Sequence, residues 1–246
     1  DTISLLKKAL HFKVDNSFEI KGINDRFQLS ECEHYIQEKL KSSWMRKGVS
    51  FVDPISCSLS EDSNFGIDVI IEPQTHVRGK CNIGNGCHLG PGSVITNSTL
   101  AENVLAVHSF INEATIGNNT SIGPFAHIRP ESNISKNSKI GNFVEIKKSC
   151  IGEGTKINHL SYVGDSALGK NINIGAGTIT ANFDGKNKHR TIIDDYSKTG
   201  ANSVLVAPIK IGAHVTIGAG STISKDIPDK SLVVERSKAI IRTKAD

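Results

Sequence analysis

The chain has 246 residues, with 29 Lys and Arg against 25 Asp and Glu, and its net charge of +4 is too small to indicate nucleic-acid binding. It contains no apolar run near the length of a membrane span and no signal-peptide pattern. Aromatic residues make up only 5% of the chain and glycines number 22, which argues against a helical bundle and favours a repetitive β-structure with tight corners.

The cysteines predict a reducing, cytoplasmic environment. There are five of them, an odd number, and none has CxxC spacing. Reduced thiols are therefore expected, and a zinc site is not. The chain begins with Asp1 rather than Met, so we expect it to be part of a longer protein.

The first 48 residues are predicted to precede the main body. Residues 1–26 are too few for a core of their own and are interpreted as the remnant of another domain, with a short helix at Ile3–Phe12 and a short strand at Phe18–Ile20. Residues 27–48 are predicted to form a linker helix. Asn24 or Asp25 can cap its start and Gly48 can end it.

A six-residue repeat dominates residues 49–224. Branched apolar residues recur six apart, most regularly at Ile122, Ile128, Ile134, Ile140 and Ile146. Three such hexads form a triangular coil of about 18 residues, with one short strand on each side and coils about 4.8 Å apart. The predicted fold is an all-β, left-handed parallel β-helix of hexapeptide repeats, preceded by the long helix. An ordinary β-sandwich would need hairpin turns at regular spacing, which the sequence lacks.

Residues 225–246 leave the repeat and are rich in Lys and Arg. Two interpretations of this basic arm remain open. It is either a solvated tail or an arm that caps the β-helix or reaches a neighbouring subunit.

The spacing of the repeat also predicts which side chains lie above one another. Inward residues separated by 17 or 18 positions share one ladder, and their neighbours in sequence point outward. One outward ladder should pair Arg129 with Lys147, a geometry suited to gripping one phosphate group. The predicted inward and outward ladders are Ile128, Ile146 and Val163; Arg129, Lys147 and Gly164; and His127, Glu145 and Tyr162.

His159 is the candidate catalytic residue. It follows Ile157, in an inward ladder of Ile140, Ile157 and Ile174, by two positions, which places it at a corner of the coil. A neutral imidazole with the ordinary pKa of about 6.5 is a competent general base at neutral pH. Residues 181–190 then interrupt the repeat, and the resulting loop is expected to bring Asn182 and Lys188 to the binding face.

Several longer strings resemble one enzyme family. GNFVEIKKS, KINHLSYVGD and NINIGAGTITANFDG are similar to the acetyltransferase domain of the bifunctional N-acetylglucosamine-1-phosphate uridyltransferase/glucosamine-1-phosphate acetyltransferases. The resemblance implies transfer of the acetyl group of acetyl-CoA to the amine of glucosamine-1-phosphate, for the synthesis of UDP-N-acetylglucosamine. It also implies a homotrimer with sites between subunits.

The resemblance assigns roles to individual residues. It implies that His159 is the base, and that Glu145 orients His159 or the amine. The sugar-phosphate site would consist of Arg129, Lys147, Tyr162, Asn173 and Lys188, and the acetyl-CoA groove of Ala176, Asn182, Phe183, Ala201, Ala219 and Arg236.

The chain departs from the family pattern at three points. The family usually has Tyr where this chain has Phe183 and Ser where it has Ala201, so two hydroxyl groups are lost. The nucleotide-binding loop of the uridyltransferase half is absent. Asn24 matches a position that would bind Mg²⁺ and nucleotide sugar in the intact protein, but alone it cannot hold an octahedral ion. Uridylyl transfer is therefore expected only of a longer protein.

Three other functions remain as alternatives: a hexapeptide acyltransferase with a different amino sugar, a zinc-dependent carbonic anhydrase, and a solenoid without catalytic activity. The anhydrase would need three converging His, and none of the nine His forms the close pair that such a site resembles.

Overall fold

The computed structural model describes residues 13–235 and residue 241. The chain divides into two compact units, Asp1–Leu40 and Lys41–Asp246, which are described separately. The predicted helix Ile3–Phe12 lies outside the described residues.

The short element near the start is a helix rather than a strand. The predicted strand Phe18–Ile20 is wrong, because the structure has a 3₁₀ helix, η2, at Ser17–Ile20. The side chain of Asn16 accepts a hydrogen bond from the N–H of Phe18 at 3.0 Å, which caps the first turn. This local bond outweighs the strand propensity of the apolar residues.

The predicted long helix is confirmed as α1, Arg26–Arg46. Asp25 caps it by accepting a hydrogen bond from the N–H of Gln28 at 2.8 Å, and Gly48 follows it with φ of +97°. Within the second unit, Trp44 packs edge-on against Phe65 with ring centroids 5.2 Å apart.

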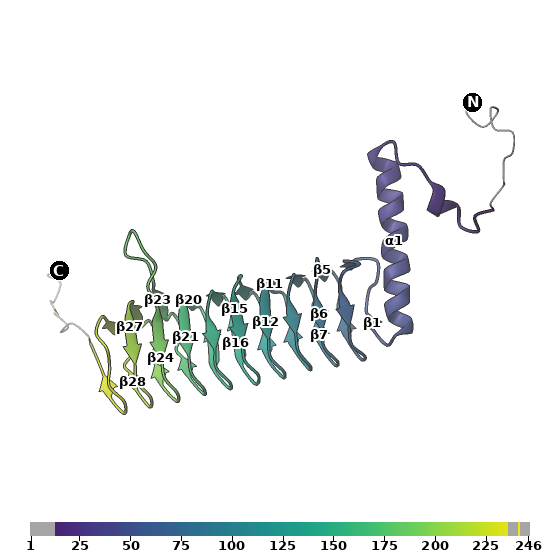
Figure 1. Cartoon of the computed structure of the whole chain (residues 1–246). Helices are drawn as coiled ribbons and strands as arrows, with labels where there is room; N and C mark the ends of the chain where they lie inside the picture. The colour runs from purple at the N-terminus through teal and green to yellow at the C-terminus, as the bar shows by residue number, and fades with distance from the viewer. Residues whose placement is uncertain (1–12, 236–240, 242–246) are drawn as a thin grey trace, which may run out of the picture. The chain divides into compact units, whose positions relative to one another are not determined.

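The remaining elements form a parallel β-solenoid with three sheets (Figure 1). Each regular coil contributes one strand to each sheet, so hydrogen-bonded neighbours within a sheet are three strands apart in sequence, except β28 and β30 at the end, which are two apart. Sheet A contains β1 Ser50–Phe51, β4 Ile70–Ile71, β7 His88–Leu89, β10 Leu105–Ala106, β13 Ser121–Ile122, β16 Lys139–Asn142, β19 Lys156–His159, β22 Asn173–Ile174, β25 Lys198–Thr199, β28 Thr216–Ile217 and β30 Leu232–Val233. Sheet B contains β2 Ser58–Leu59, β5 His76–Arg78, β8 Val94–Thr96, β11 Phe110–Asn112, β14 His127–Ile128, β17 Glu145–Lys147, β20 Tyr162–Gly164, β23 Ile179–Ala181, β26 Val204–Val206 and β29 Thr222–Ile223. Sheet C contains β3 Asn64–Phe65, β6 Asn82–Ile83, β9 Thr99–Leu100, β12 Ala114–Ile116, β15 Ser132–Ile134, β18 Cys150–Ile151, β21 Ser166–Leu168, β24 Thr191–Ile193 and β27 Ile209–Ile211.

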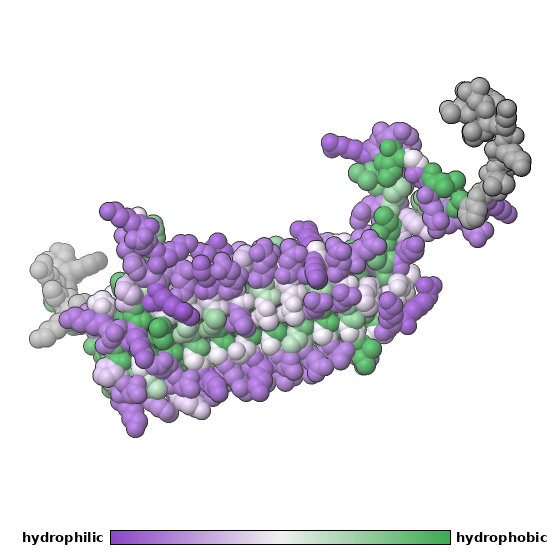
Figure 2. Space-filling model, viewed as in Figure 1, coloured by the Kyte–Doolittle hydropathy of each residue, from purple (hydrophilic) through white to green (hydrophobic). Residues whose placement is uncertain are grey.

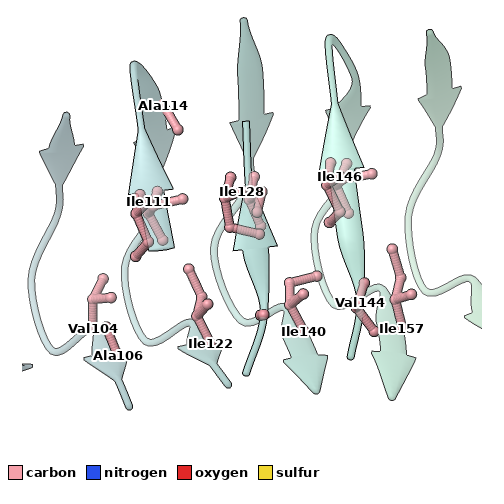
Figure 3. Close-up of a cluster of buried hydrophobic side chains, with 14 of the residues drawn as sticks. Val104, Ala106, Ile111, Ala114, Ile122, Ile128, Ile140, Val144, Ile146 and Ile157 are labelled. Atoms are coloured by element: carbon pink, nitrogen blue, oxygen red, sulfur yellow. The ribbon is translucent and has the colours of Figure 1, made fainter. Parts of the chain in front are cut away.

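The hexad residues fill the interior of the solenoid. Ile128 pairs with Ile146, and Ile140 pairs with Ile157, in successive coils, and all four side chains are fully buried. Figure 3 shows these side chains stacked in rows along the solenoid. Burial of a branched residue at every sixth position supplies the stabilisation that the thin coils need. The predicted left-handed parallel β-helix of hexapeptide repeats, with one long helix before it, is confirmed.

The coils continue beyond residue 224, where the repeat was expected to end. Ile227 forms a bridge with Ile211, and β30 pairs with β28. Both links join residues 16 apart, a spacing that Val94–Phe110 and Leu105–Ser121 also have in an earlier coil, so the stacking continues although the six-residue repeat of the sequence has ended.

A single long loop interrupts the regular coils, as predicted. It leaves the solenoid between β23 and β24 (Figure 1) and carries hydrophilic side chains (Figure 2). All five cysteines are unpaired, as expected. Among the described residues, the helices include none with the length and apolar character needed to cross a membrane.

Candidate active site

The outward ladders predicted from the repeat are present on sheet B. Glu145 pairs with His127 on one side and with Tyr162 on the other, and Lys147 pairs with Gly164. The N–H of Arg129 donates to the carbonyl of Ile146 at 2.8 Å, which places Arg129 beside Lys147 in the neighbouring coil. One face of sheet B therefore carries a line of polar and charged side chains.

Glu145 is engaged by Arg129 rather than by His159. Nη1 of Arg129 lies 2.6 Å from Oε1 of Glu145, and both side chains are a little over one-third exposed. The guanidinium therefore leans back along the strand, toward the start of β17. The predicted role of Glu145 in orienting His159 has no direct contact to support it in this arrangement.

The loop brings Lys188 to Lys147. Close contact with the amine of Lys147, and then the positive charge of Lys147, lower the pKa of the exposed Lys188 amine. The carboxylate of Asp165 acts in the opposite direction. Two ammonium groups held this close form a site that an anion with several oxygens would stabilise.

A hollow of about 630 Å³ surrounds the two lysines. Its walls come from the ends of sheet B strands, from the adjoining corner and from the base of the loop. It is lined by Glu131, Lys147, Lys148, Cys150, Asp165, Lys188, His189 and Arg190. Five of these eight residues are Lys, Arg or His, so the hollow suits a negatively charged ligand.

The loop is held at both its tip and its base. Phe183 and Lys188 form an antiparallel bridge, and the N–H of His189 donates to the carbonyl of Asn182 at 2.7 Å. At the tip, the N–H of Asn187 is the main cause of a strongly lowered pKa of Asp184, followed by the bond from the His189 ring at 2.7 Å.

Asn182 anchors the base of the loop to sheet B. Its side chain is buried and donates to the carboxylate of Asp165 and, at 3.4 Å, to the hydroxyl of Tyr162. A Cβ atom at Gly164 would lie 2.4 Å from the Tyr162 hydroxyl, so the tyrosine ring rests over this glycine. Asn182, predicted to line an acetyl-CoA groove, thus contacts Tyr162, one of the sugar-phosphate candidates.

His159 stands in a second ladder, at the corner between sheets A and B. It pairs with Asn142 in the preceding coil, and the pairings of β19, β22, β25 and β28 continue the line into later coils. Each of these strands has one buried residue facing the axis, and the residue two positions later lies at the corner. We call these corner residues the corner ladder. The buried residues are Ile140, Ile157, Ile174, Thr199 and Ile217, and the corner ladder is Asn142, His159, Ala176, Ala201 and Ala219. The predicted base and three predicted acetyl-CoA contacts therefore lie in a single line along the solenoid.

The corner ladder is narrow beyond His159. A Cβ atom at Gly175 would lie 2.6 Å from backbone atoms of the next coil, and one at Gly200 would lie 2.3 Å from the N atom of Ala219. The coils can stack this closely only because glycine occupies these positions. Beyond His159 the corner ladder therefore carries only small side chains, of which Ala201 and Ala219 are exposed.

His159 contacts Asn142 directly. Its Nδ1 atom lies 2.6 Å from Oδ1 of Asn142, and the imidazole is exposed. Asn142 was not among the predicted site residues. It follows Ile140 by two positions, as His159 follows Ile157, so the spacing of the repeat was the signal that could have located it one coil before the candidate base.

The predicted site residues come from two sheets and from the loop. His159 ends β19 on sheet A, and Lys147 pairs with Gly164 on sheet B. His159 is not among the residues that line the hollow around the two lysines. Asn173 lies on sheet A, where it pairs with Lys156 and Lys198. Arg236 lies outside the described residues.

Metal-binding geometry is absent from the part of the chain that the structure describes. There, no group of three or more His, Cys, Asp or Glu side chains is placed to hold a metal ion. Asn24 bonds through its N–H to Oε1 of Gln28 at 2.7 Å, and its neighbour Asp25 caps α1. These residues alone do not fit an octahedral Mg²⁺ site.

Two family models match the solenoid. The model described as bacterial transferase hexapeptide (six repeats) matches residues 62–97 and 190–225. The model described as GMPPB C-terminal domain matches residues 110–183. Among solved structures, a UDP-N-acetylglucosamine acyltransferase from Francisella novicida is 20% identical with a TM-score of 0.48, over 73% of this chain and 65% of that one.

Curated relatives match along the whole chain. The bifunctional protein GlmU of Prochlorococcus marinus strain NATL2A is 95% identical over all 246 residues. That of strain MIT 9211 is 60% identical over 98% of the chain. The chain spans 55% and 53% of the lengths of these two relatives. At this similarity, the chain belongs to the bifunctional GlmU family and corresponds to the C-terminal, hexapeptide-repeat part of its members.

Proposed function

We propose that this chain transfers the acetyl group of acetyl-CoA to the amine of glucosamine-1-phosphate, giving N-acetylglucosamine-1-phosphate. The observation that carries the proposal is the corner ladder, in which the exposed imidazole of His159 continues directly into Ala176, Ala201 and Ala219. A base beside a row of small side chains suits a reaction between an amine and a long, thin acyl donor.

The lysine pair supports a phosphorylated acceptor. Lys147 and Lys188 would hold the phosphate between them, and ligand binding would relieve the repulsion that lowers the pKa of Lys188. Arg129 and Tyr162 lie on the same face and would contact the sugar. Asn173 is proposed to complete this site from sheet A.

The reaction balances with the groups present. The amine nitrogen attacks the thioester carbonyl carbon, a C–N bond forms, and His159 takes the proton that the nitrogen loses. The C–S bond then breaks, and the CoA thiolate leaves with that proton. The N–H of Gly175 donates to Oγ1 of Thr199 at 2.9 Å, whereas those of Ala176 and Gly177 have no acceptor among the described residues. These two N–H groups are proposed to bind the oxyanion.

The acetyl-CoA groove would follow the corner ladder. Its small side chains would let the pantetheine arm lie against backbone. Phe183 is 60% exposed on the loop and would offer an aromatic face but no hydroxyl. Asn182 and Arg236 are retained as proposed contacts of the donor, Asn182 through the position of the loop.

The separation of His159 from the lysine hollow supports a site shared between copies in a homotrimer. A mixture of a His159→Ala chain with a Lys147→Met chain tests this, since mixed trimers would contain sites with both residues intact. In a random equal mixture, roughly a quarter of sites made from two copies would be intact. Activity that stays at the level of the separate variants would rule out sharing.

The direct test of function measures thiol release from acetyl-CoA with glucosamine-1-phosphate against unphosphorylated amino sugars. Activity restricted to the phosphorylated sugar, and lost in His159→Ala, is the expected result. Activity with an unphosphorylated amino sugar would favour a different acyltransferase. An absence of saturable acetyl-CoA binding by calorimetry would favour a non-catalytic solenoid.

A further inference from the structure

We propose that Asn142 is a positioning residue that fixes the ring of His159 and selects Nε2 as the atom that accepts the proton. This inference rests on the proposed function, because it concerns the base of that reaction. It assigns a role to a residue whose side chain was not among the predicted site residues.

The backbone holds the pair in register. β16 and β19 have four residues each, whereas the other solenoid strands have two or three. Their ladder pairs Asn142 with His159 at the corner itself. A Cβ atom at Gly141 would lie 2.0 Å from the carbonyl oxygen of Asn158, so the two strands approach as closely as a glycine permits. The separation of the two side chains is therefore fixed by main-chain hydrogen bonds.

The contact determines the tautomer. Oδ1 of an amide only accepts hydrogen bonds, so the Nδ1 atom 2.6 Å away carries the hydrogen. In the neutral ring, the lone pair is then on Nε2, which points away from Asn142. The exposed imidazole presents this atom to solvent, where an amine would approach.

The partner is a neutral amide rather than a carboxylate. The nearest carboxylate along this run of chain, Glu145, is engaged by Arg129 at 2.6 Å. An amide orients the ring without adding a negative charge beside it, so it stabilises the imidazolium less than a carboxylate would. Replacing Asn142 by Asp separates these two effects.

The first measurement needs no substrate. Nitrogen-15 spectra of the His159 ring, recorded at alkaline pH on the unliganded chain, report which nitrogen carries the hydrogen. We expect Nδ1 in the wild type and a mixture of tautomers in Asn142→Ala. A wild-type ring protonated on Nε2 would overturn the inference.

The second measurement is kinetic. Asn142→Ala is expected to lower kcat about 10-fold or more, with the KM for glucosamine-1-phosphate changed less than about twofold, as for groups that orient a reacting residue. Asn142→Asp should recover part of the loss, and the rising limb of its kcat/KM profile should move to higher pH. Asn82→Ala, an exposed strand asparagine in sheet C, is the matched control and should match the wild type.

The results separate this inference from the proposed function. If the wild type releases no thiol, the proposed function fails, while the tautomer spectra still decide whether Asn142 fixes the ring. If the wild type is active and Asn142→Ala keeps both its tautomer and its kcat, the inference is overturned. If Asn142→Ala fails to fold, the comparison of Asn142→Asp with the wild type supplies the pH readout.

Discussion

Replacing Lys147 by Met tests whether the two ammonium groups form the anion site. Methionine keeps most of the length of the side chain and removes its charge. The side chain of Lys147 lowers the pKa of Lys188, first through close contact between the two amines and then through its charge. The lysines thus repel each other in the free protein, and a bound phosphate would draw them together. The variant should lose acceptor affinity without losing stability.

The expected rise in the KM for glucosamine-1-phosphate follows from the hydrogen bond between Lys147 and the phosphate that the substitution removes. A hydrogen bond to a charged group contributes about 1.5–3 kcal/mol, which corresponds to a rise of roughly 10- to 150-fold in the KM for glucosamine-1-phosphate. The KM for acetyl-CoA should not change, because the corner ladder lies at the other edge of sheet B.

The free energy of unfolding should rise with pH in this range, whereas phosphate binding should weaken as Lys188 loses its proton. A lysine with a lowered pKa binds fewer protons in the folded than in the unfolded chain. Stability therefore rises as the pH increases through the lowered pKa of Lys188 toward the ordinary value of 10.5. In Lys147→Met, where the cause of the shift is removed, this rise should shrink.

Steady-state thiol release, with each substrate varied in turn, and thermal unfolding across this pH range provide the assays. Lys80→Met, at an exposed lysine elsewhere on the solenoid, is the control for loss of one positive charge. An unchanged KM for the sugar phosphate in Lys147→Met would refute the phosphate assignment. A raised KM for acetyl-CoA would show that the ladders do not separate the two substrates.

Three further substitutions test the scaffold. Ile146→Ala, at a fully buried core position, should lower the free energy of unfolding in urea by about 2–5 kcal/mol. Gly200→Ala would place a Cβ 2.3 Å from the N atom of Ala219, so both the melting temperature and the affinity for acetyl-CoA should fall, and an unchanged KM would argue against a groove there. Asp184 has a lowered pKa, foremost through the N–H of Asn187. Its contribution to the stability of the loop is present above the ordinary pKa of about 3.9 and is lost as the pH falls below that value. In Asp184→Asn, the susceptibility of the loop to limited proteolysis should therefore depend less on acid pH.

The fold was predictable because one physical requirement repeats. Each side of the prism needs a branched apolar residue facing the axis, and the six-residue spacing of Ile122 to Ile146 records this directly. The end of the solenoid was not predictable in the same way. Ile227 and Val233 continue the stacking, but the isoleucine–glycine pairs that mark the earlier coils are missing from this segment, so the sequence gives no repeat to follow there.

The side-chain ladders were predictable, but their contacts were not. Register places Arg129, Glu145 and Lys147 on one face, yet long side chains can lean along the strand. Arg129 leans toward Glu145 and forms an ion pair with it. The side chain that contacts His159 is Asn142 rather than Glu145.

The two parts of the candidate site are held in different ways, and this bears on how each acts. His159 is fixed by the pairing of β16 with β19 and by a short hydrogen bond to Asn142. At this corner the two strands approach so closely that only glycine fits at position 141. Lys188 lies on a loop that joins the solenoid at its base, through the buried Asn182 and its bond to Asp165. A proton acceptor must hold its angle to the amine to be effective, whereas a phosphate can be gripped from several directions. The rigid position thus suits the group with the stricter geometry. The lysine pair joins Lys147, on a strand, to Lys188, on the loop, and a bound phosphate would offset the repulsion between them.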